Sequence, residues 1–143
     1  MCEFYRYFKE NMEALGLPAP ESLFGSLQAA IGTSSAILMH IDKFGKNVTI
    51  GELIRAGTKL EVLAPMSACT AGFYVGAAIG SIAVATGRCL GRGTSLSDVL
   101  ATSHRYGLDR PWLHPTLHRC HAVYDADAPS RDLTRSRMMT MTA

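Results

Sequence analysis

Five glycines recur at helical spacing in and just after a long uncharged segment. The chain has no charged residue from Val62 to Gly87, and the five are Gly72, Gly76, Gly80, Gly87 and Gly91. At 100° per residue they fall within an arc of about 100°, so a helix here would have one face without side chains. In water each glycine costs a helix about 1 kcal/mol relative to alanine, whereas helices in lipid use small residues for close packing. The pattern favours a membrane-inserting helix over about residues 66–87.

The composition lies between those of soluble and membrane proteins. Of the 143 residues 18% are charged and 48% are hydrophobic, while about a quarter of a typical soluble domain is charged. The net charge of +2 supplies no clustered basic excess, so we expect no nucleic-acid partner. The four cysteines form no CxxC pair and indicate no disulfide framework. The first residues, MCEFYRYFKENMEALG, do not resemble a Sec signal peptide, so any export is expected to use another route.

A second apolar segment precedes the glycine-rich one. Its 20 residues, from 22 to 41, are long enough to cross a bilayer. On a helical wheel its small residues share one face, which comprises Gly25, Ala29, Gly32 and Ala36. We therefore expect helices over about 22–41 and 66–87 to pair as a helical hairpin through their small faces.

Shorter helices are predicted on either side of this hairpin. Phe4, Tyr7 and Phe8 give residues 3–15 an amphipathic pattern, and Ser95 or Ser97 can cap a helix that ends at Gly107. GELIRAG favours a short helix, KLEVL is compatible with a strand, and Pro111 to Pro115 indicates irregular backbone followed by a short helix or strand. The fold class is therefore mainly α, with a single domain over 1–124 and a disordered tail over 125–143.

Hydroxyl groups interrupt both apolar segments, which makes them poor permanent anchors and favours insertion from a soluble state. Thr33, Ser34, Ser81 and Thr86 are candidates to line a water-filled path in a helical assembly. The alternative for each hydroxyl is a hydrogen bond to a carbonyl of its own helix.

Four residues near the end of the chain have side chains that can bind metals. They are His114, His118, Cys120 and His121. Their spacing is not that of a zinc finger, and Pro115 is expected to disturb helical geometry between the first two histidines. We interpret the group as packing or surface residues and expect no metal and no cofactor. No GxSxG, HExxH, P-loop or paired-carboxylate motif is present, so we do not expect an enzyme.

These features resemble small bacterial type VI secretion effectors with glycine zippers, which are pore-forming toxins. The resemblance rests on Gly72, Gly76 and Gly80, extended by Gly87 and Gly91, on the preceding small-faced segment, on the small size and on the missing signal peptide. It implies an antibacterial toxin that is soluble in the producer cytoplasm, is carried by a secretion-tube protein and is released into the target periplasm. It also implies homo-oligomeric insertion in the inner-membrane bilayer, loss of ion gradients and an immunity protein in the producer.

Two other functions fit the same sequence. A non-toxic membrane or assembly protein would use the glycine zipper without depolarising cells. A soluble α-helical binding or metal-binding module would instead bury both apolar segments in a monomeric core.

Overall fold

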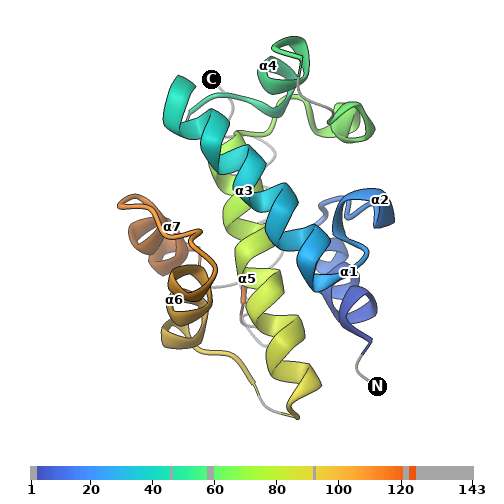
Figure 1. Cartoon of the computed structure of the whole chain (residues 1–143), viewed down its shortest axis with the longest axis vertical. Coiled ribbons are helices and arrows are strands. Elements are labelled where there is room, and N and C mark those ends of the chain that lie inside the picture. The colour runs from blue at the N-terminus through green and yellow to red at the C-terminus, as the bar shows by residue number, and fades with distance from the viewer. Residues whose placement is uncertain (1–2, 46, 58–59, 92, 121–122, 125–143) are drawn as a thin grey trace.

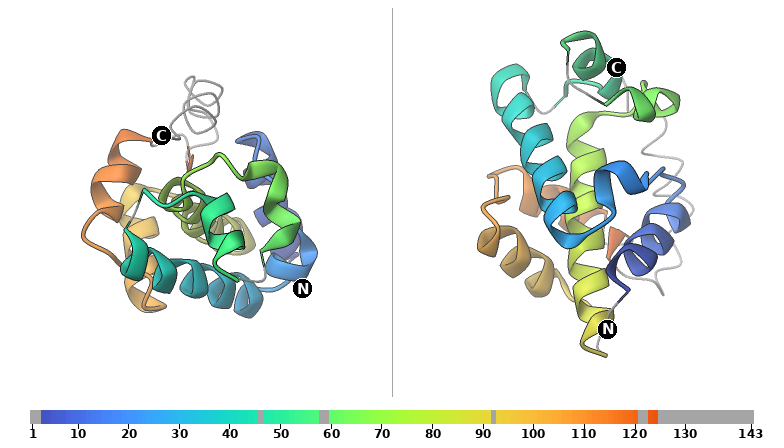
Figure 2. Two further views of the ribbon diagram at one scale, coloured as in Figure 1. Left: turned by 90° about the horizontal axis from the view of Figure 1, so that it is seen from above. Right: turned by 45° about the vertical axis from the view of Figure 1, so that its right-hand side comes forward.

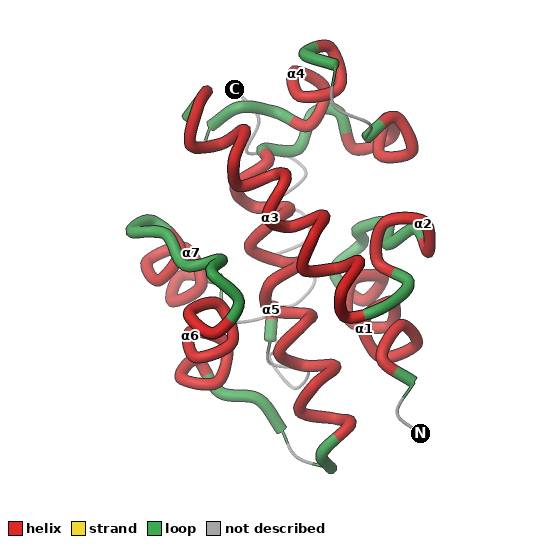
Figure 3. The backbone as a smooth tube through the Cα atoms, in the orientation of Figure 1, coloured by secondary structure: helices red, strands yellow, loops and turns green. Residues whose placement is uncertain are grey.

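The computed structural model confirms a mainly α-helical chain. It describes residues 3–45, 47–57, 60–91, 93–120, 123 and 124, and these ranges contain no strand (Figure 3). The elements are α1 (Phe4–Ala14), α2 (Glu21–Phe24), α3 (Leu27–Phe44), α4 (Ile50–Arg55), the 3₁₀ helix η1 (Glu61–Met66), α5 (Ala71–Cys89), α6 (Leu96–Arg105) and α7 (Leu113–Arg119). The predicted disordered tail, 125–143, lies outside the described residues.

Helix α5 forms the centre of the molecule. Figures 1 and 2 show α3 crossing it on one side, α1 and α2 beside it, and α6 and α7 on the opposite flank. Of its 19 residues, 15 are buried. A helix that is apolar on all sides is stable only when it is surrounded, and here four other helices surround it. The core is therefore built around the segment that carries the glycines.

Aromatic side chains join α1 and α2 to one side of α5. The rings of Phe8 and Phe24 stack with centroids 4.8 Å apart, and Phe24 lies 6.3 Å from the ring of Tyr74. The Tyr74 hydroxyl donates a hydrogen bond of 2.7 Å to the carbonyl of Pro18, in the linker between α1 and α2. The predicted amphipathic helix at the start of the chain is therefore confirmed, and its apolar side is part of the core.

The prediction of one continuous helix over 22–41 is wrong, because two helices occupy this range. The chain forms the single turn α2, breaks at Gly25 and Ser26, and begins again as α3. Ser26 has an extended backbone and its hydroxyl accepts a hydrogen bond of 3.1 Å from the Ala29 amide, so it caps a new helix. A second hydroxyl, that of Thr33, donates to the Leu23 carbonyl and holds the short turn against α3.

The central helix also begins later than predicted, at Ala71 and not near Met66. Residues 61–66 form a 3₁₀ helix that contains Pro65. Backbone hydrogen bonds from Ile50 to Cys69 and from Ala71 to Val48 then hold residues 69–71 beside the start of α4, which keeps Thr70 extended. KLEVL, which is also compatible with a strand, contributes its last three residues, 61–63, to this 3₁₀ helix.

Helix α6 has the caps that its sequence predicts, whereas α7 forms where irregular backbone was predicted. Ser95 and Asp98 form a capping box at the start of α6, and Gly107 follows its end with a φ of 70°. The stretch predicted as irregular contains α7, with Pro115 in its first turn. Proline is tolerated there because the first amide groups of a helix have no partner within it.

Alanine substitutions at two α5 glycines test this packing. A Cβ on Gly80 would overlap Cγ1 of Val123, whereas a Cβ on Gly76 would lie 3.9 Å from Cγ2 of Thr116, an ordinary contact. Both changes gain helix propensity, and overpacking costs about 1–3 kcal/mol. We expect Gly80→Ala to be less stable than Gly76→Ala by about 1–3 kcal/mol in urea unfolding. The double variant G80A/V123A should recover part of this difference, and equal stabilities of the two single variants would contradict the packing.

Candidate functional site

The glycines of the central segment contact different neighbours and do not form one continuous interface. Gly76 faces Thr116 and Leu113 of α7, and Gly80 faces Val123. Gly72 and Gly87 are buried, whereas Gly91 lies beyond the helix with a φ of 73°. Only four of the five predicted zipper residues therefore belong to α5. The short distance between α5 and α7 is the structural consequence of this small face.

The small face predicted over residues 25–36 points away from α5. Gly32 and Ala36 are exposed, Ala29 is partly buried, and Gly25 belongs to the break before α3. The side of α3 that enters the core carries two small and three branched aliphatic residues, namely Ala30, Ser34, Ile37, Leu38 and Ile41. Helices α3 and α5 contact each other, but the predicted pairing of two small faces is not the contact that forms here.

A buried polar contact joins α1 to the middle of α5. The side-chain amide of Asn11 donates hydrogen bonds of 2.8 Å to the hydroxyl oxygen of Ser81 and to the carbonyl oxygen of Val123. Asn11 is 5% exposed and Ser81 is fully buried. A buried hydrogen-bonded group fixes the relative positions of its elements because leaving it unpaired is costly. Ser81, predicted to line a pore, is thus part of the interior of this fold.

The other three candidate pore-lining hydroxyls also lie within the protein. Thr33 bonds to the Leu23 carbonyl. The oxygens of Ser34 and Thr86 are buried and have no hydrogen-bond partner in the described part of the chain. A hydroxyl in this condition destabilises a fold by about 1–3 kcal/mol, and most folds avoid it. These two residues therefore lower the stability of the structure described here.

Charged side chains hold α1 against the end of α5 at the surface. Arg88 donates a hydrogen bond of 2.7 Å to Glu10 and lies 4.0 Å from the ring centre of Tyr7. The hydrogen bond from Arg88 lowers the pKa of the Glu10 carboxyl below its ordinary value. The ion pair therefore stabilises the fold above the ordinary glutamate pKa and is lost as the pH falls through the lowered pKa. Both side chains are about half exposed, so the contribution is small.

The described cysteines and the buried tyrosine lie in different surroundings. Cys69 and Cys120 are buried and outside any disulfide, whereas Cys89 is disulfide-bonded. Burial raises the pKa of the Cys69 thiol to about 11, so it stays protonated and poorly nucleophilic at neutral pH. Burial also raises the pKa of the Tyr74 hydroxyl, which is engaged with Pro18.

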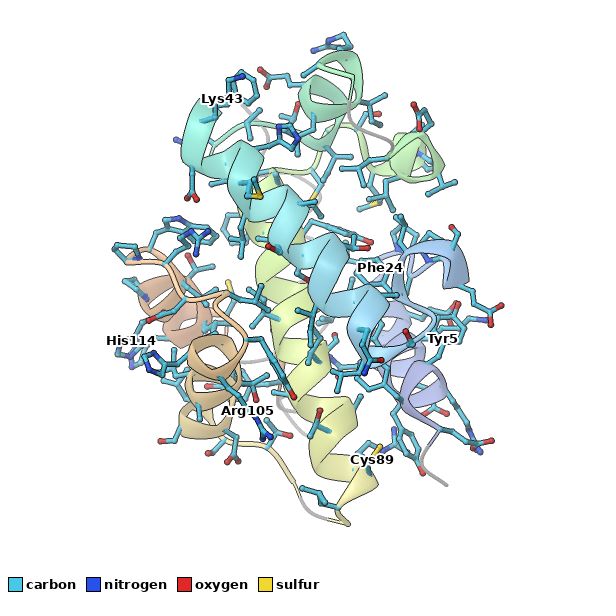
Figure 4. All side chains as sticks on the ribbon, viewed as in Figure 1. Tyr5, Phe24, Lys43, Cys89, Arg105 and His114 are labelled. Atoms are coloured by element: carbon cyan, nitrogen blue, oxygen red, sulfur yellow. The ribbon has the colours of Figure 1, made fainter. Side chains whose placement is uncertain are left out.

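The metal-binding candidates are spread over the outer flank and the interior. His114 and His118 are exposed on α7 with ring centroids 6.4 Å apart, and Figure 4 shows His114 at the edge of the molecule. Cys120 is buried, and His121 lies outside the described residues. Pro115 was expected to disturb helical geometry between the two histidines, but His114, Pro115 and His118 all belong to the continuous helix α7. In the described ranges, no three histidine, cysteine or carboxylate side chains are grouped as a metal site would require.

Among the helices in the described ranges, none combines the length and hydropathy needed to cross a bilayer. Searches against protein families, curated proteins and solved structures find no match to this chain. The functional interpretation therefore rests on the residues themselves.

Asn11, which makes the buried contact with Ser81 and Val123, was not identified from the sequence. It lies between Phe8 and Met12, on the face of α1 that is otherwise apolar. An amide on the apolar side of an amphipathic helix is the signal that could have indicated a buried polar contact. Its two partners are distant in sequence, so no local pattern could identify them.

Asn11→Leu tests this contact. Leucine has a volume similar to that of asparagine, but it leaves the Ser81 hydroxyl and the Val123 carbonyl without the amide that donates to them. We expect a loss of about 2–3 kcal/mol in the free energy of unfolding, against about 1 kcal/mol for Ser81→Ala. The double variant should lose less than the sum, because both changes remove the same interaction. Additive losses in urea titrations would argue against the coupling.

Proposed function

We propose that this chain is a secreted antibacterial toxin that permeabilises the inner membrane of a target cell after leaving a folded, water-compatible state. In this proposal the structure described above is the transported form. The central helix is kept from water by α1, α3, α6 and α7 and is released at the membrane. A secretion-tube protein would carry the folded chain, and an immunity protein would protect the producer.

The observation that carries the proposal is a pair of unpaired hydroxyls on the two most apolar helices. The hydroxyl oxygens of Ser34 on α3 and of Thr86 on α5 are buried and have no hydrogen-bond partner among the described residues. In this fold alanine and valine would serve better at these positions. In an assembly with a water-filled interior, both hydroxyls would bond to water, as polar groups inside membrane bundles do. The two residues thus suit a second arrangement of the same helices.

Two further features support a change of arrangement. The face of α3 around Gly32 and Ala36 is exposed, and a Cβ on Gly32 would meet nothing within 4 Å. This face borders a pocket of about 300 Å³ that Leu23 and Leu60 also line. The ion pair between α1 and Arg88 is exposed and contributes little, so separation of α1 has to break mainly the Asn11 hydrogen bonds and the packing of Phe8. Oligomerisation through the exposed small face and separation of α1 are the two steps that we propose.

Removal of the unpaired Ser34 hydroxyl should have opposite effects on the stability of the fold and on membrane permeabilisation. We expect Ser34→Ala to raise the free energy of unfolding by about 1 kcal/mol and to reduce dye release from vesicles of phosphatidylethanolamine and phosphatidylglycerol. Thr70→Val is the matched control, because Thr70 is also buried and unpaired but lies at the start of α5. It should stabilise the fold and leave dye release unchanged. Unaltered release by S34A would contradict a water-facing role.

A bulky residue on the exposed face tests oligomerisation. Gly32→Leu is expected to fold normally, since the position is open, and to abolish both vesicle leakage and loss of membrane potential after periplasmic expression. Gly93→Leu is the control, because it is equally open but lies in the loop before α6. If the wild-type chain neither binds vesicles nor depolarises cells, the toxin proposal fails and a soluble binding module is the better description. Membrane binding without depolarisation would indicate the assembly protein.

A further inference from the structure

A pocket of about 150 Å³ lies between the second half of α5 and α6. Its helical walls are two facing stripes, one from Ala83 to Leu90 and the other from Asp98 to Arg105. Each stripe consists of residues at spacings of three, four and seven, which places its members on a single helix face. Figure 4 shows Arg105 on α6, on the side toward α5.

The space exists because the facing residues are small. Ala83 and Gly87 on α5 oppose Ala101 on α6, and Gly93 lies in the loop that closes one end. Larger residues at these positions would fill the gap, as the core does elsewhere around α5. Gly87, predicted as a zipper residue, thus contributes to a cavity wall in this fold.

Two opposite charges line the pocket at different levels. Asp98 and Arg105 are seven residues apart on α6, so their Cα atoms are separated by about 10.5 Å along the helix axis. The Asp98 carboxylate is oriented by hydrogen bonds from the Ser95 amide and hydroxyl. Arg105 forms no ion pair with any carboxylate in the described ranges, and its guanidinium lies 5.7 Å from the ring centre of Tyr106.

We propose that this pocket binds a small dipolar molecule with an ammonium group at one end and a carboxylate at the other. The carboxylate would accept hydrogen bonds from Arg105, and the ammonium would donate to Asp98. Because the two charged side chains project from positions two turns apart, the ligand must separate its charges by several methylene groups. The class that fits is a short ω-amino acid, larger than glycine.

Thr86 supplies a third polar group on the α5 wall. Its hydroxyl oxygen is buried and unpaired among the described residues, while the residue itself is half-buried against the pocket. Threonine in a helix adopts either of two χ1 rotamers, which place its hydroxyl and methyl groups differently. After such a rotation the hydroxyl can donate to the ligand carboxylate. Thr86→Val should therefore raise the melting temperature of the free protein while weakening ligand binding.

A series of ω-amino acids of increasing length tests which distance between ammonium and carboxylate the pocket prefers. Calorimetric titration of the full chain with glycine, β-alanine, γ-aminobutyrate and 5-aminovalerate should give an affinity that rises from glycine to a maximum at an intermediate length. Arg105→Gln and Asp98→Asn should each weaken the best ligand roughly tenfold or more, because each removes a charge-assisted hydrogen bond. Asparagine keeps an acceptor for the helix cap, so the fold of α6 is preserved.

Filling the pocket gives a test that keeps both charges. Ala101 is exposed at the rim, so Ala101→Leu should fold and occlude the site. Ala14→Leu, at an exposed position of α1, and Arg6→Gln, on the same helix, are matched controls that should bind as the wild type does. Absence of binding for every member of the series at millimolar concentration would overturn the proposal. Binding that A101L and R105Q leave unchanged would overturn it as well.

Discussion

The structure depends on the need to surround a helix that has no polar side. Almost every residue of α5 is buried, and its side chains are mostly small or aliphatic. Small side chains protrude little, so the neighbouring helices can approach closely from several directions. Of the surrounding helices, α3 is nearly as long as α5 and the others are shorter, and each of them covers a part of the same apolar helix. Asn11 then fixes one of these helices in register through its bonds to Ser81 and Val123.

Much of the fold could be predicted because it follows from local patterns. The amphipathic period of α1 and the cap at Ser95 depend on residues a few positions apart. The errors occurred where distant contacts decide the backbone. Thr70 is extended because residues 48–50 bond to its neighbours, and hydropathy does not reveal that pairing. The break at Ser26 did have a local signal, since serine after glycine can cap a helix, but the continuous apolar composition hid it.

The candidate site was harder to predict because one residue type serves several purposes. Gly80 admits Val123, Gly87 contributes to a cavity, and Gly91 reverses the backbone with a positive φ. A helical wheel places all three on one face and assigns them one role. The wheel describes the geometry of an isolated helix correctly, but the partners of each position come from elsewhere in the chain. The exposed small face of α3 illustrates the same limit, since its period predicts a contact with α5, whereas Gly32 and Ala36 are exposed in this fold.

The unpaired hydroxyls connect the two uses that we propose for α5. A core selected only for stability would replace Ser34 and Thr86 by residues of similar shape without a polar atom. Both residues instead reduce the free energy needed to open the fold, because the hydroxyls gain hydrogen bonds once water reaches them. The same property makes Thr86 suitable for a pocket, where a ligand can satisfy its hydroxyl in the closed state. A ligand held there would stabilise the closed state by mass action, so the two proposals predict opposite effects on release of the central helix.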